Sequence, residues 1–467
     1  MDENFDFGMV GLGVMGRNFI LNVADHGYSA IGLDTDAQKV EALTAEGTGK
    51  QVEGTVSKEV FVKALKSPRK IMLLVPAGKI VDAVIEDLLP LLDKGDLIID
   101  GGNSFFPDTN RRITYLADKG IHFMGVGVSG GAEGARFGPS IMPGGPKEGY
   151  ALIEPIFRAV AAKVDEEPCV AHMGNTSAGN YVKMVHNGIE YGLMQLIAET
   201  YDVMKRGLGL SNETIGQTFG KWSEGRLKSF LVEITADIFK QKDPLTGEDL
   251  VDKILDKAKQ KGTGKWTSQN AMDLGMPVPT IDAAVTMRGI SALKEQRSQA
   301  SKVFDQAKPE LIADEQWADT LEQGLYSAFV ITYAQGLAQL SAASLEYSYE
   351  LNISAVARIW RGGCIIRASL LEHIRKAYER TPALKNLLLD DAFAEILDSS
   401  HNGLRSVLKL AIDTGIPVSC LGASLSYFDA FKSEKLPLNL VQAQRDYFGS
   451  HTYERTDQQG VFHTEWG

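Results

Sequence analysis

With 467 residues, the chain is too long for a single hydrophobic core and is expected to form two or three domains. Its 48 basic and 60 acidic residues give a net charge of −12, which disfavours nucleic-acid binding because phosphate backbones require a basic surface. No apolar run reaches the roughly 18 residues of a membrane-spanning helix, so no membrane partner is expected. The acidic N-terminus lacks the pattern of a signal peptide, which predicts a cytoplasmic protein. Three scattered cysteines without a CxxC pair predict neither a disulfide framework nor a metal site.

Residues 1–177 alternate short apolar runs with helical patterns. The apolar runs lie at 7–10, 29–33, 70–75, 96–100 and 122–126. Short strands that are bounded by glycine and separated by helices are typical of a doubly wound, mainly parallel sheet. The first 177 residues are therefore predicted to be a Rossmann-type α/β domain.

Residues 178–435 show long segments with an apolar period of 3.6 and no convincing strand, which predicts a large all-helical domain. Its first helix is expected over about 180–206, before Gly207 and Gly209. Residues 436–467 have no core-forming periodicity, so we expect an irregular C-terminal tail that frays or packs on something else.

A glycine-rich motif follows the first predicted strand and opens a helix. Its residues are Gly11, Leu12, Gly13, Val14, Met15 and Gly16. In this context the glycines allow a tight turn and close approach to a pyrophosphate at the helix N-terminus. The segments 75–77 (Val75, Pro76 and Ala77) and 101–104 end later strands, where open α/β sheets bind ligands.

Asp34 ends the second predicted strand, 23 residues after Gly11, in the triplet Asp34, Thr35, Asp36. An acidic residue at this place accepts hydrogen bonds from an adenosine ribose hydroxyl. The competing interpretation is an ordinary loop carboxylate.

Four polar residues form a stripe in an otherwise apolar helix: Lys183, His186, Asn187 and Glu190. Their spacing of i, i+3, i+4 and i+7 places them on one helix face. Unpaired buried charges are costly, so the stripe is either a solvated face or the wall of a cleft that holds an anionic substrate beside a base and an acid. The stripe alone does not decide between them.

With these residues in place, the chain resembles the decarboxylating 6-phosphogluconate dehydrogenase family over essentially its whole length. The motifs that carry the resemblance lie at 11–16, 100–104, 127–131, 138–145, 183–191, 261–267, 359–367 and 444–453. The first few are shared with the wider β-hydroxyacid dehydrogenase group, whereas the last four are specific to this family. We interpret the segment 359–367 as helix packing.

The resemblance implies oxidation of 6-phosphogluconate at C3, with hydride transfer to a nicotinamide dinucleotide, and loss of CO₂ to give ribulose 5-phosphate, a reaction of the pentose phosphate pathway. It implies that Lys183 is the base at the 3-hydroxyl and that Glu190 is the acid that protonates C1 of the enediol. A base role requires a neutral lysine and therefore a lowered pKa.

The resemblance also implies the substrate-binding residues. Those for the carboxylate and hydroxyls are Asn103, Ser129, Gly130, Gly131, His186 and Asn187. Those for the phosphate are Tyr191, Lys265, Thr267, Arg288 and Arg445, with His451 nearby. Arg445 and His451 lie on the tail, which in the family reaches into the neighbouring subunit, so an obligate homodimer with tail exchange is expected.

The triplet Asp34, Thr35, Asp36 departs from the family, in which an Asn-Arg-Thr triplet grips the 2′-phosphate of NADP. Two carboxylates stand where the phosphate would lie, and two charges about 4 Å apart repel by roughly 4 kcal/mol at an effective dielectric constant near 20. Although the family default is NADP, we therefore expect NAD to be preferred, with Lys39 as the one nearby cation that opposes this expectation. Pro76 stands where the family often has lysine.

Two alternatives remain open. The first is another β-hydroxyacid dehydrogenase that acts on a small unphosphorylated acid, for which the phosphate residues would have no task. The second is a dinucleotide-sensing or structural dimer without activity, which would explain neither Lys183 nor Glu190.

Overall fold

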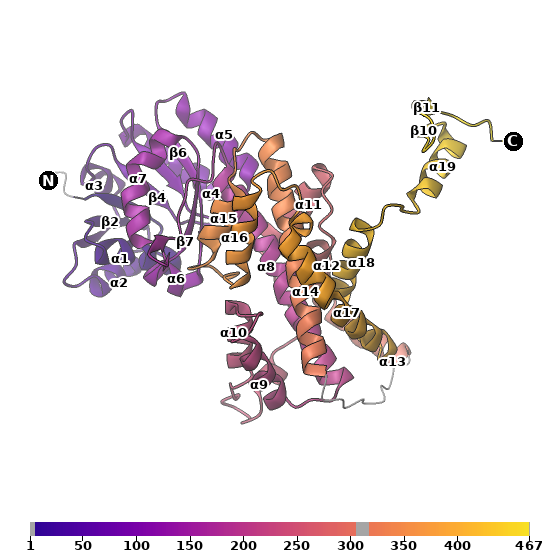
Figure 1. Ribbon diagram of the computed structural model, residues 1–467. Coiled ribbons are helices and arrows are strands. Elements are labelled where there is room, and N and C mark those ends of the chain that lie inside the picture. The colour runs from indigo at the N-terminus through magenta and orange to yellow at the C-terminus, as the bar shows by residue number, and fades with distance from the viewer. Residues whose placement is uncertain (1–4, 305–316, 467) are drawn as a thin grey trace.

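The structure, a computed structural model, describes residues 5–304 and 317–466. An α/β domain lies at one side, a helical domain follows it, and a tail stands apart from the helices at the other end of the molecule (Figure 1). Residues 1–4, which form the acidic start of the chain, and residues 305–316 of the expected helical domain lie outside the described residues.

The first domain contains a seven-stranded sheet in the order β3-β2-β1-β4-β5-β6-β7. All neighbouring strands pair in parallel except β6 and β7, which are antiparallel. The strands are β1 (Phe7–Val10), β2 (Ala30–Leu33), β3 (Val52–Thr55), β4 (Lys70–Leu73), β5 (Leu97–Asp100), β6 (His122–Ser129) and β7 (Ser140–Gly144). This arrangement confirms the predicted mainly parallel Rossmann-type sheet.

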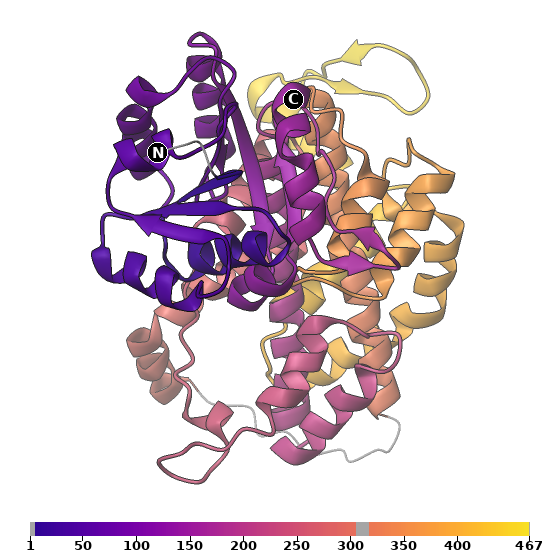
Figure 2. The ribbon, with the colours of Figure 1, turned by 90° about the vertical axis from the view of Figure 1, so that its left-hand side faces the viewer.

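Helices cover both faces of the sheet, as Figure 2 also shows from the side. Phe19 of α1 and Phe157 of α7 pack in the core on one face, whereas Phe61 of α3 and Ile85 of α4 pack in the core on the other. The helices of this domain are α1 (Val14–Asp25), α2 (Ala37–Glu46), α3 (Lys58–Lys63), α4 (Lys79–Leu88), α5 (Phe106–Ala117), α6 (Gly131–Phe137) and α7 (Lys147–Val160). A small hairpin, β8 (Lys163–Val164) with β9 (Glu167–Pro168), leads to the second domain.

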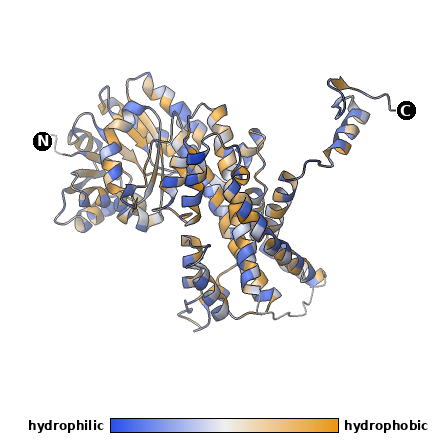
Figure 3. Ribbon diagram, in the orientation of Figure 1, coloured by the Kyte–Doolittle hydropathy of each residue, from blue (hydrophilic) through white to orange (hydrophobic). Residues whose placement is uncertain are grey.

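The regular elements described between residues 178 and 435 are helices, as expected. The long ones are α8 (Ala178–Asp202), α14 (Trp317–Glu346) and α17 (Asp391–Asp413). The others are α9 (Asn212–Trp222), α10 (Phe230–Ile238), α11 (Thr263–Asp273), α12 (Pro279–Ala292), α13 (Lys294–Val303), α15 (Ile353–Trp360), α16 (Leu370–Arg380) and α18 (Ser419–Phe431). Their buried apolar residues form one large hydrophobic cluster, and Figure 3 colours hydrophobic residues orange along these helices.

Helices α8 and α14 form the centre of this domain and are buried on most of their surface. Buried polar side chains on them bond to neighbouring elements: the amide nitrogen of Gln339 donates to the carbonyl of Thr267 at 3.0 Å. Glu199 of α8 is 2% exposed and accepts hydrogen bonds from the backbone N–H groups of Cys420 and Leu421 at the start of α18. Groups left without partners there would destabilise the fold, so these bonds fix how the helices meet.

Helix α8 begins directly against the sheet because glycines remove the side chains between them. A Cβ atom on Gly179 would lie 2.3 Å from the carbonyl oxygens of Gly125 and Met142, and one on Gly127 would lie 2.4 Å from the Cβ of Lys183. Backbone on both sides leaves no room for even a methyl group. The first two turns of α8 are therefore seated on β6 and β7, and Lys183 is placed over β6.

The C-terminal tail differs from the irregular segment that was expected. It contains α19 (Leu438–Gly449) and a short hairpin of β10 (Tyr453–Glu454) and β11 (Val461–Phe462). Apolar side chains on it are exposed, including Leu440, Phe448 and Val461. The apolar pattern was too weak to predict a helix because the only buried residue of α19 is a carboxylate, that of Asp446.

Among the described residues, no helix is both long enough and apolar enough to cross a lipid bilayer.

Replacing Gly179 by alanine is expected to lower the free energy of unfolding by about 1–3 kcal/mol, because the added methyl group meets backbone atoms that cannot move independently. The urea or thermal unfolding midpoint of the purified protein measures this change.

Gly289→Ala is the matched control, because nothing lies within 4 Å of an added Cβ there and the position is an exposed one in helix α12. It should leave the midpoint unchanged or raise it slightly. Equal midpoints for Gly179→Ala and Gly289→Ala would contradict the packing described for α8.

Candidate active site

The stripe on α8 forms one connected polar group inside the protein. The Nζ of Lys183 lies 3.5 Å from Nδ1 of His186, and that same nitrogen lies 3.0 Å from Oδ1 of Asn187 and 3.7 Å from the carboxylate of Glu190. Lys183 is 7% exposed and His186 is 0% exposed, whereas the Glu190 side chain is 19% exposed. The solvated-face interpretation is therefore wrong, since the stripe is largely removed from water.

Burial changes the proton affinities of these groups in complementary directions. Removal from water lowers the pKa of Lys183, although the carboxylate of Glu190 partly opposes this effect. Burial raises the pKa of Glu190, opposed by Lys183 and Arg288, and burial together with Lys183 lowers the pKa of His186 well below its ordinary value. Burial thus favours the neutral form of Lys183 and the protonated form of Glu190, and His186 is neutral at neutral pH.

The walls around the stripe come from both domains. Ser129, at the end of β6, lies 3.4 Å from Nε2 of His186, and the ring of Trp360 contacts His186 edge to face at 5.5 Å between centroids. Next to them, Gly130 approaches the carbonyl of Gly363 so closely that a Cβ would lie 2.7 Å away. Packing was the expected role of 359–367, and the structure adds that this segment forms a wall of the site.

Tyr191 and Arg288 meet at the far end of the stripe. The guanidinium of Arg288 lies 4.4 Å from the centroid of the Tyr191 ring, and it also donates to the carbonyl of Lys259 at 2.7 Å. Arg288 is half-buried and lowers the pKa of Glu190 electrostatically, against the larger effect of burial. It therefore lies close enough to Glu190 to act on it electrostatically while its guanidinium packs on the ring of Tyr191.

The loop before α11 brings different residues to the site than the motif suggested. The hydroxyl of Thr267 is buried and donates to the carbonyls of Met184 and Thr263, both at 2.9 Å, while Lys265 is exposed. In contrast, the hydroxyl of Thr263 accepts from the amide of Asn187 at 3.1 Å. Lys261 lines the adjoining cavity.

Lys261 and Thr263 were not among the residues predicted from the sequence, because the segment 261–267 offers two lysines and two threonines in a repeated spacing. The feature that distinguishes these residues is their position relative to the start of the helix. Helix α11 begins at Thr263, so Lys261 and Thr263 lie at its start, whereas Thr267 lies one turn inside it.

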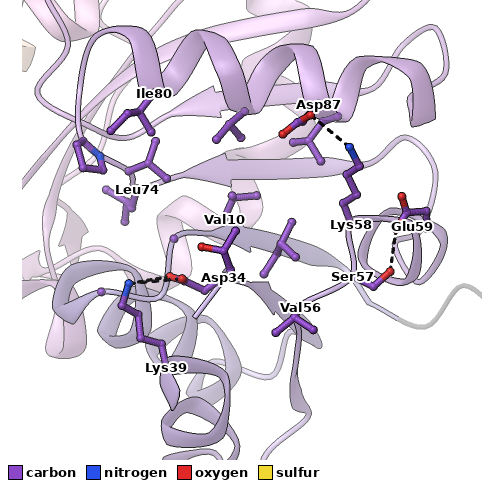
Figure 4. Close-up of a pocket in the computed structure, with 18 residues that line it drawn as sticks. Val10, Asp34, Lys39, Val56, Ser57, Lys58, Glu59, Leu74, Ile80 and Asp87 are labelled. Atoms are coloured by element: carbon purple, nitrogen blue, oxygen red, sulfur yellow. Dashed lines mark hydrogen bonds and ion pairs between the residues drawn. The ribbon is translucent and has the colours of Figure 1, made fainter. Parts of the chain in front are cut away.

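The glycine-rich turn borders a cavity of about 760 Å³ at the carboxyl ends of β1, β2 and β4 (Figure 4). Gly11 has a φ of 94°, and a Cβ there would lie 2.6 Å from the carbonyl of Leu74, while a Cβ on Gly16 would lie 1.9 Å from the carbonyl of Gly11. Both glycines are thus required for this turn, which leaves the start of α1 open for a pyrophosphate, as a dinucleotide fold needs.

Asp34 faces this cavity with its carboxylate already hydrogen-bonded. The N–H of Leu12 donates to it at 2.8 Å, the N–H of Asp36 donates at 3.0 Å, and Lys39 lies 3.4 Å away (Figure 4). Although burial opposes ionisation, these contacts lower the pKa of Asp34. Asp36 accepts from the N–H of Gln38 as the cap of α2, and Thr35 is exposed.

The charges around the cavity nearly balance, and among the described residues that line it there is no arginine. Those charged residues are Asp34, Lys39, Lys58, Glu59 and Asp87.

A second cavity, of about 750 Å³, shares Leu74, Val75 and Pro76 with the first. Met15, Ala77, Asn103, Val128 and Lys261 also line it. The buried guanidinium of Arg112 holds its two loops together by donating to the carbonyl of Gly78 at 3.0 Å and contacting Asp100 at 3.3 Å. The two cavities therefore adjoin at Leu74, Val75 and Pro76, and the second reaches Val128, the residue before Ser129.

The tail residues Arg445 and His451 are exposed and lie on the part of the chain that stands apart from the helices (Figure 1). The structure of one chain does not bring them to its own stripe. Within residues 5–304 and 317–466, no group of three or more His, Cys, Asp and Glu side chains has the arrangement of a metal site.

Two family models together match nearly the whole chain. Residues 6–174 match the NAD binding domain of 6-phosphogluconate dehydrogenase, and residues 179–466 match the 6-phosphogluconate dehydrogenase C-terminal domain. The decarboxylating, NADP(+)-dependent 6-phosphogluconate dehydrogenase of Bacillus subtilis (strain 168) is 52% identical over 461 residues, which cover 98% of each chain. The decarboxylating enzyme 1 of Saccharomyces cerevisiae is 53% identical over 454 residues, with 96% of this chain and 92% of the relative covered.

A solved structure of 6-phosphogluconate dehydrogenase from Plasmodium falciparum superposes with a TM-score of 0.96 at 44% identity. It covers 99% of this chain and 100% of its own. Because both family models and the full-length relatives agree, the alternatives of an enzyme for an unphosphorylated acid and of an inactive dimer are set aside. The chain therefore belongs to the 6-phosphogluconate dehydrogenase family.

Proposed function

We propose that this chain oxidises 6-phosphogluconate at C3 and releases CO₂ to form ribulose 5-phosphate, with Lys183 and Glu190 as the base and the acid. The observation that carries the proposal is the buried pair on one face of α8, in which burial lowers the pKa of Lys183 and raises that of Glu190. A nicotinamide in the second cavity would accept the hydride from C3.

Lys183 serves the first two steps. As a neutral amine it takes the proton of the 3-hydroxyl while the C3–H bond breaks, which leaves a 3-keto acid and a lysine cation. The cation then stabilises the negative charge that develops on the keto oxygen as the bond between C1 and C2 breaks and CO₂ leaves. Glu190 gives its proton to the enediol carbon, and transfer of a proton from the Lys183 cation to the Glu190 carboxylate, directly or through solvent, restores the neutral base and the acid.

The remaining groups of the site hold the substrate. Ser129, His186 and Asn187 converge beside Lys183 and are suited to the hydroxyls and carboxylate, with Asn103, Gly130 and Gly131 on the adjoining loops. Tyr191 and Arg288 are suited to the phosphate because a dianion prefers charge-assisted donors. We add Lys261 and Thr263 to this phosphate set, and Lys265 stays a prediction.

We propose NAD as the preferred cofactor. The carboxylates of Asp34 and Asp36 accept hydrogen bonds from backbone N–H groups. Among the described residues of the cavity the cations are Lys39 and Lys58, and each forms an ion pair with a carboxylate. A 2′-phosphate therefore meets negative charge without a free cation. A relative named as NADP(+)-dependent is 52% identical, so this proposal concerns the local residues and not the family.

We also propose a homodimer in which each tail completes the partner's site. The support is the exposed position of Arg445 and His451, together with exposed apolar side chains on the same tail. Exposed apolar side chains that lie together are typical of protein–protein interfaces.

Lys183→Arg should lower kcat by about 10²–10⁴-fold, because a guanidinium keeps its charge at all accessible pH values and cannot act as a base. The measurement is steady-state reduction of the dinucleotide, with dinucleotide affinity determined separately by fluorescence titration and expected to persist. Lys205→Arg, on the turn that follows α8, is the matched control and should keep full activity. Retained turnover in Lys183→Arg would rule out the proposed base.

Glu190→Gln should change the pH dependence of kcat/KM in a defined direction. The active enzyme carries one proton on the pair, so the wild type loses activity at low pH when Lys183 also becomes protonated and at high pH when the acidic proton of the pair is lost. The glutamine variant cannot lose that acidic proton, so its alkaline limb should disappear while its acidic limb remains. Exchange of solvent deuterium into C1 of ribulose 5-phosphate should also be strongly reduced; an unchanged bell-shaped profile with normal exchange would exclude Glu190 as the acid.

The wild type should show a higher kcat/KM with NAD than with NADP, and Thr35→Arg should shift this ratio towards NADP by about 10- to 100-fold. The estimate corresponds to one charge-assisted hydrogen bond to the 2′-phosphate, about 1.5–3 kcal/mol. Thr48→Arg adds the same charge at another exposed site on this domain and should leave the ratio unchanged. A wild-type preference for NADP would contradict the proposal.

A further inference from the structure

The tail is folded around a carboxylate instead of an apolar core. Asp446 is 0% exposed, and it is the only buried residue of α19. Two donors reach one carboxylate oxygen: the N–H of Thr452 at 2.9 Å and Nδ1 of His463 at 2.8 Å. Two more reach the other oxygen: the N–H of Thr464 at 3.1 Å and the indole N–H of Trp466 at 2.8 Å.

Asp446 thereby joins three separate parts of the tail, namely helix α19, the turn that follows it and the C-terminal residues after β11. A carboxylate has about four acceptor positions, and all of them are used here. Although burial opposes ionisation, the bonds from His463, Thr464, Trp466 and Thr452 lower the pKa of Asp446 to about 2. The carboxylate is therefore ionised throughout the physiological pH range, and its hydrogen-bond donors all come from the tail itself.

The turn held in this way is the one that carries His451. Ser450 and Thr452, its neighbours, have φ values of 50° and 60°, a left-handed conformation that is strained for residues with a side chain and especially for a β-branched one. The backbone carbonyl of Asp446 accepts from the N–H of Ser450 at 2.9 Å, and its carboxylate accepts from that of Thr452. Asp446 thus fixes the chain on both sides of His451.

Arg445 is tied to the same turn by Gln442. The amide oxygen of Gln442 accepts from the guanidinium of Arg445 at 3.1 Å, while its amide nitrogen donates to the carbonyl of Thr452 at 2.6 Å. Arg445 and His451 are both exposed, whereas the groups that hold them are half-buried or buried. Two cationic or polar side chains are therefore presented outward from one rigid support.

We propose that Asp446 is a positioning residue that presents Arg445 and His451 in fixed geometry for the substrate phosphate in the partner's site. This inference rests on the proposed exchange of tails between subunits. A support of this kind reduces the conformational entropy that Arg445 and His451 lose when they bind the phosphate. It also explains why a tail with no apolar core has a defined shape at all.

The test uses the full-length protein with Asp446→Asn. Asparagine has the same shape but turns an N–H₂ group towards two of the four donors, so the support should loosen without added bulk. The KM for 6-phosphogluconate should rise about 10-fold, whereas kcat and the KM for the dinucleotide should change less than about 2-fold. Trp466→Phe, which removes one donor, should shift the same KM in the same direction by less.

Asp457→Asn is the matched control, because Asp457 lies in the same tail and forms an exposed ion pair with Arg455. It should leave all constants unchanged. Hydrogen exchange of the tail amides should accelerate at Thr452 and Thr464 in Asp446→Asn and not in Asp457→Asn.

Arg445→Ala and the pair Arg445→Ala/His451→Ala separate this inference from the proposed function. If Asp446 acts through these residues, then adding Asp446→Asn to the pair should not raise the KM further. A raised KM in Arg445→Ala with a normal KM in Asp446→Asn would overturn the positioning role and leave tail exchange intact. A normal KM in Arg445→Ala would overturn tail exchange, and the positioning role with it.

Discussion

The removal of Lys183 from water is the constraint on which the site depends. An amine at the surface would be protonated at neutral pH and unable to accept the proton of a hydroxyl. In this protein the side chain lies between α8 and β6, where burial lowers its pKa, and the nearest carboxylate, that of Glu190, is itself made a weaker acid by burial. One physical cause therefore prepares the proposed base and the proposed acid together.

This placement in turn depends on how the two domains meet. Helix α8 belongs to the helical domain, yet its first turns are seated on the sheet because Gly179 meets the strand backbone directly and Gly127 leaves room for the side chain of Lys183. The same strand, β6, ends in Ser129 beside His186, and its Val128 lines the second cavity, which adjoins the cavity at the glycine-rich turn. The proposed substrate-binding groups are arranged around the proposed base on α8, so a small shift of this helix would change the geometry of all of them.

The sequence predicted the parts whose signals are local. The alternation of apolar runs and helical patterns predicted the parallel sheet, and the glycine spacing predicted the dinucleotide-binding turn. The spacing of Lys183 and Glu190 predicted that they share one helix face. Strands β3 and β7 were missed because one is half-exposed and the other contains proline and glycine. The helix in the tail was missed because its organising residue, Asp446, is charged, and charged residues are rarely buried. The proposal of Lys261 and Thr263 as phosphate-binding residues in place of Thr267 depends on where helix α11 begins. Local sequence patterns do not define the first residue of a helix to within one turn.

The proton affinity of Lys183 is the property that tests this account most directly. An NMR titration of the side-chain methylene next to Nζ, assigned by its absence in Lys183→Arg, measures that pKa in the intact enzyme without substrate. We expect a midpoint below the ordinary lysine value of 10.5, because burial outweighs the attraction of Glu190. A midpoint at or above that value would show that Lys183 is a stable cation, and the proposed base would have to be another group.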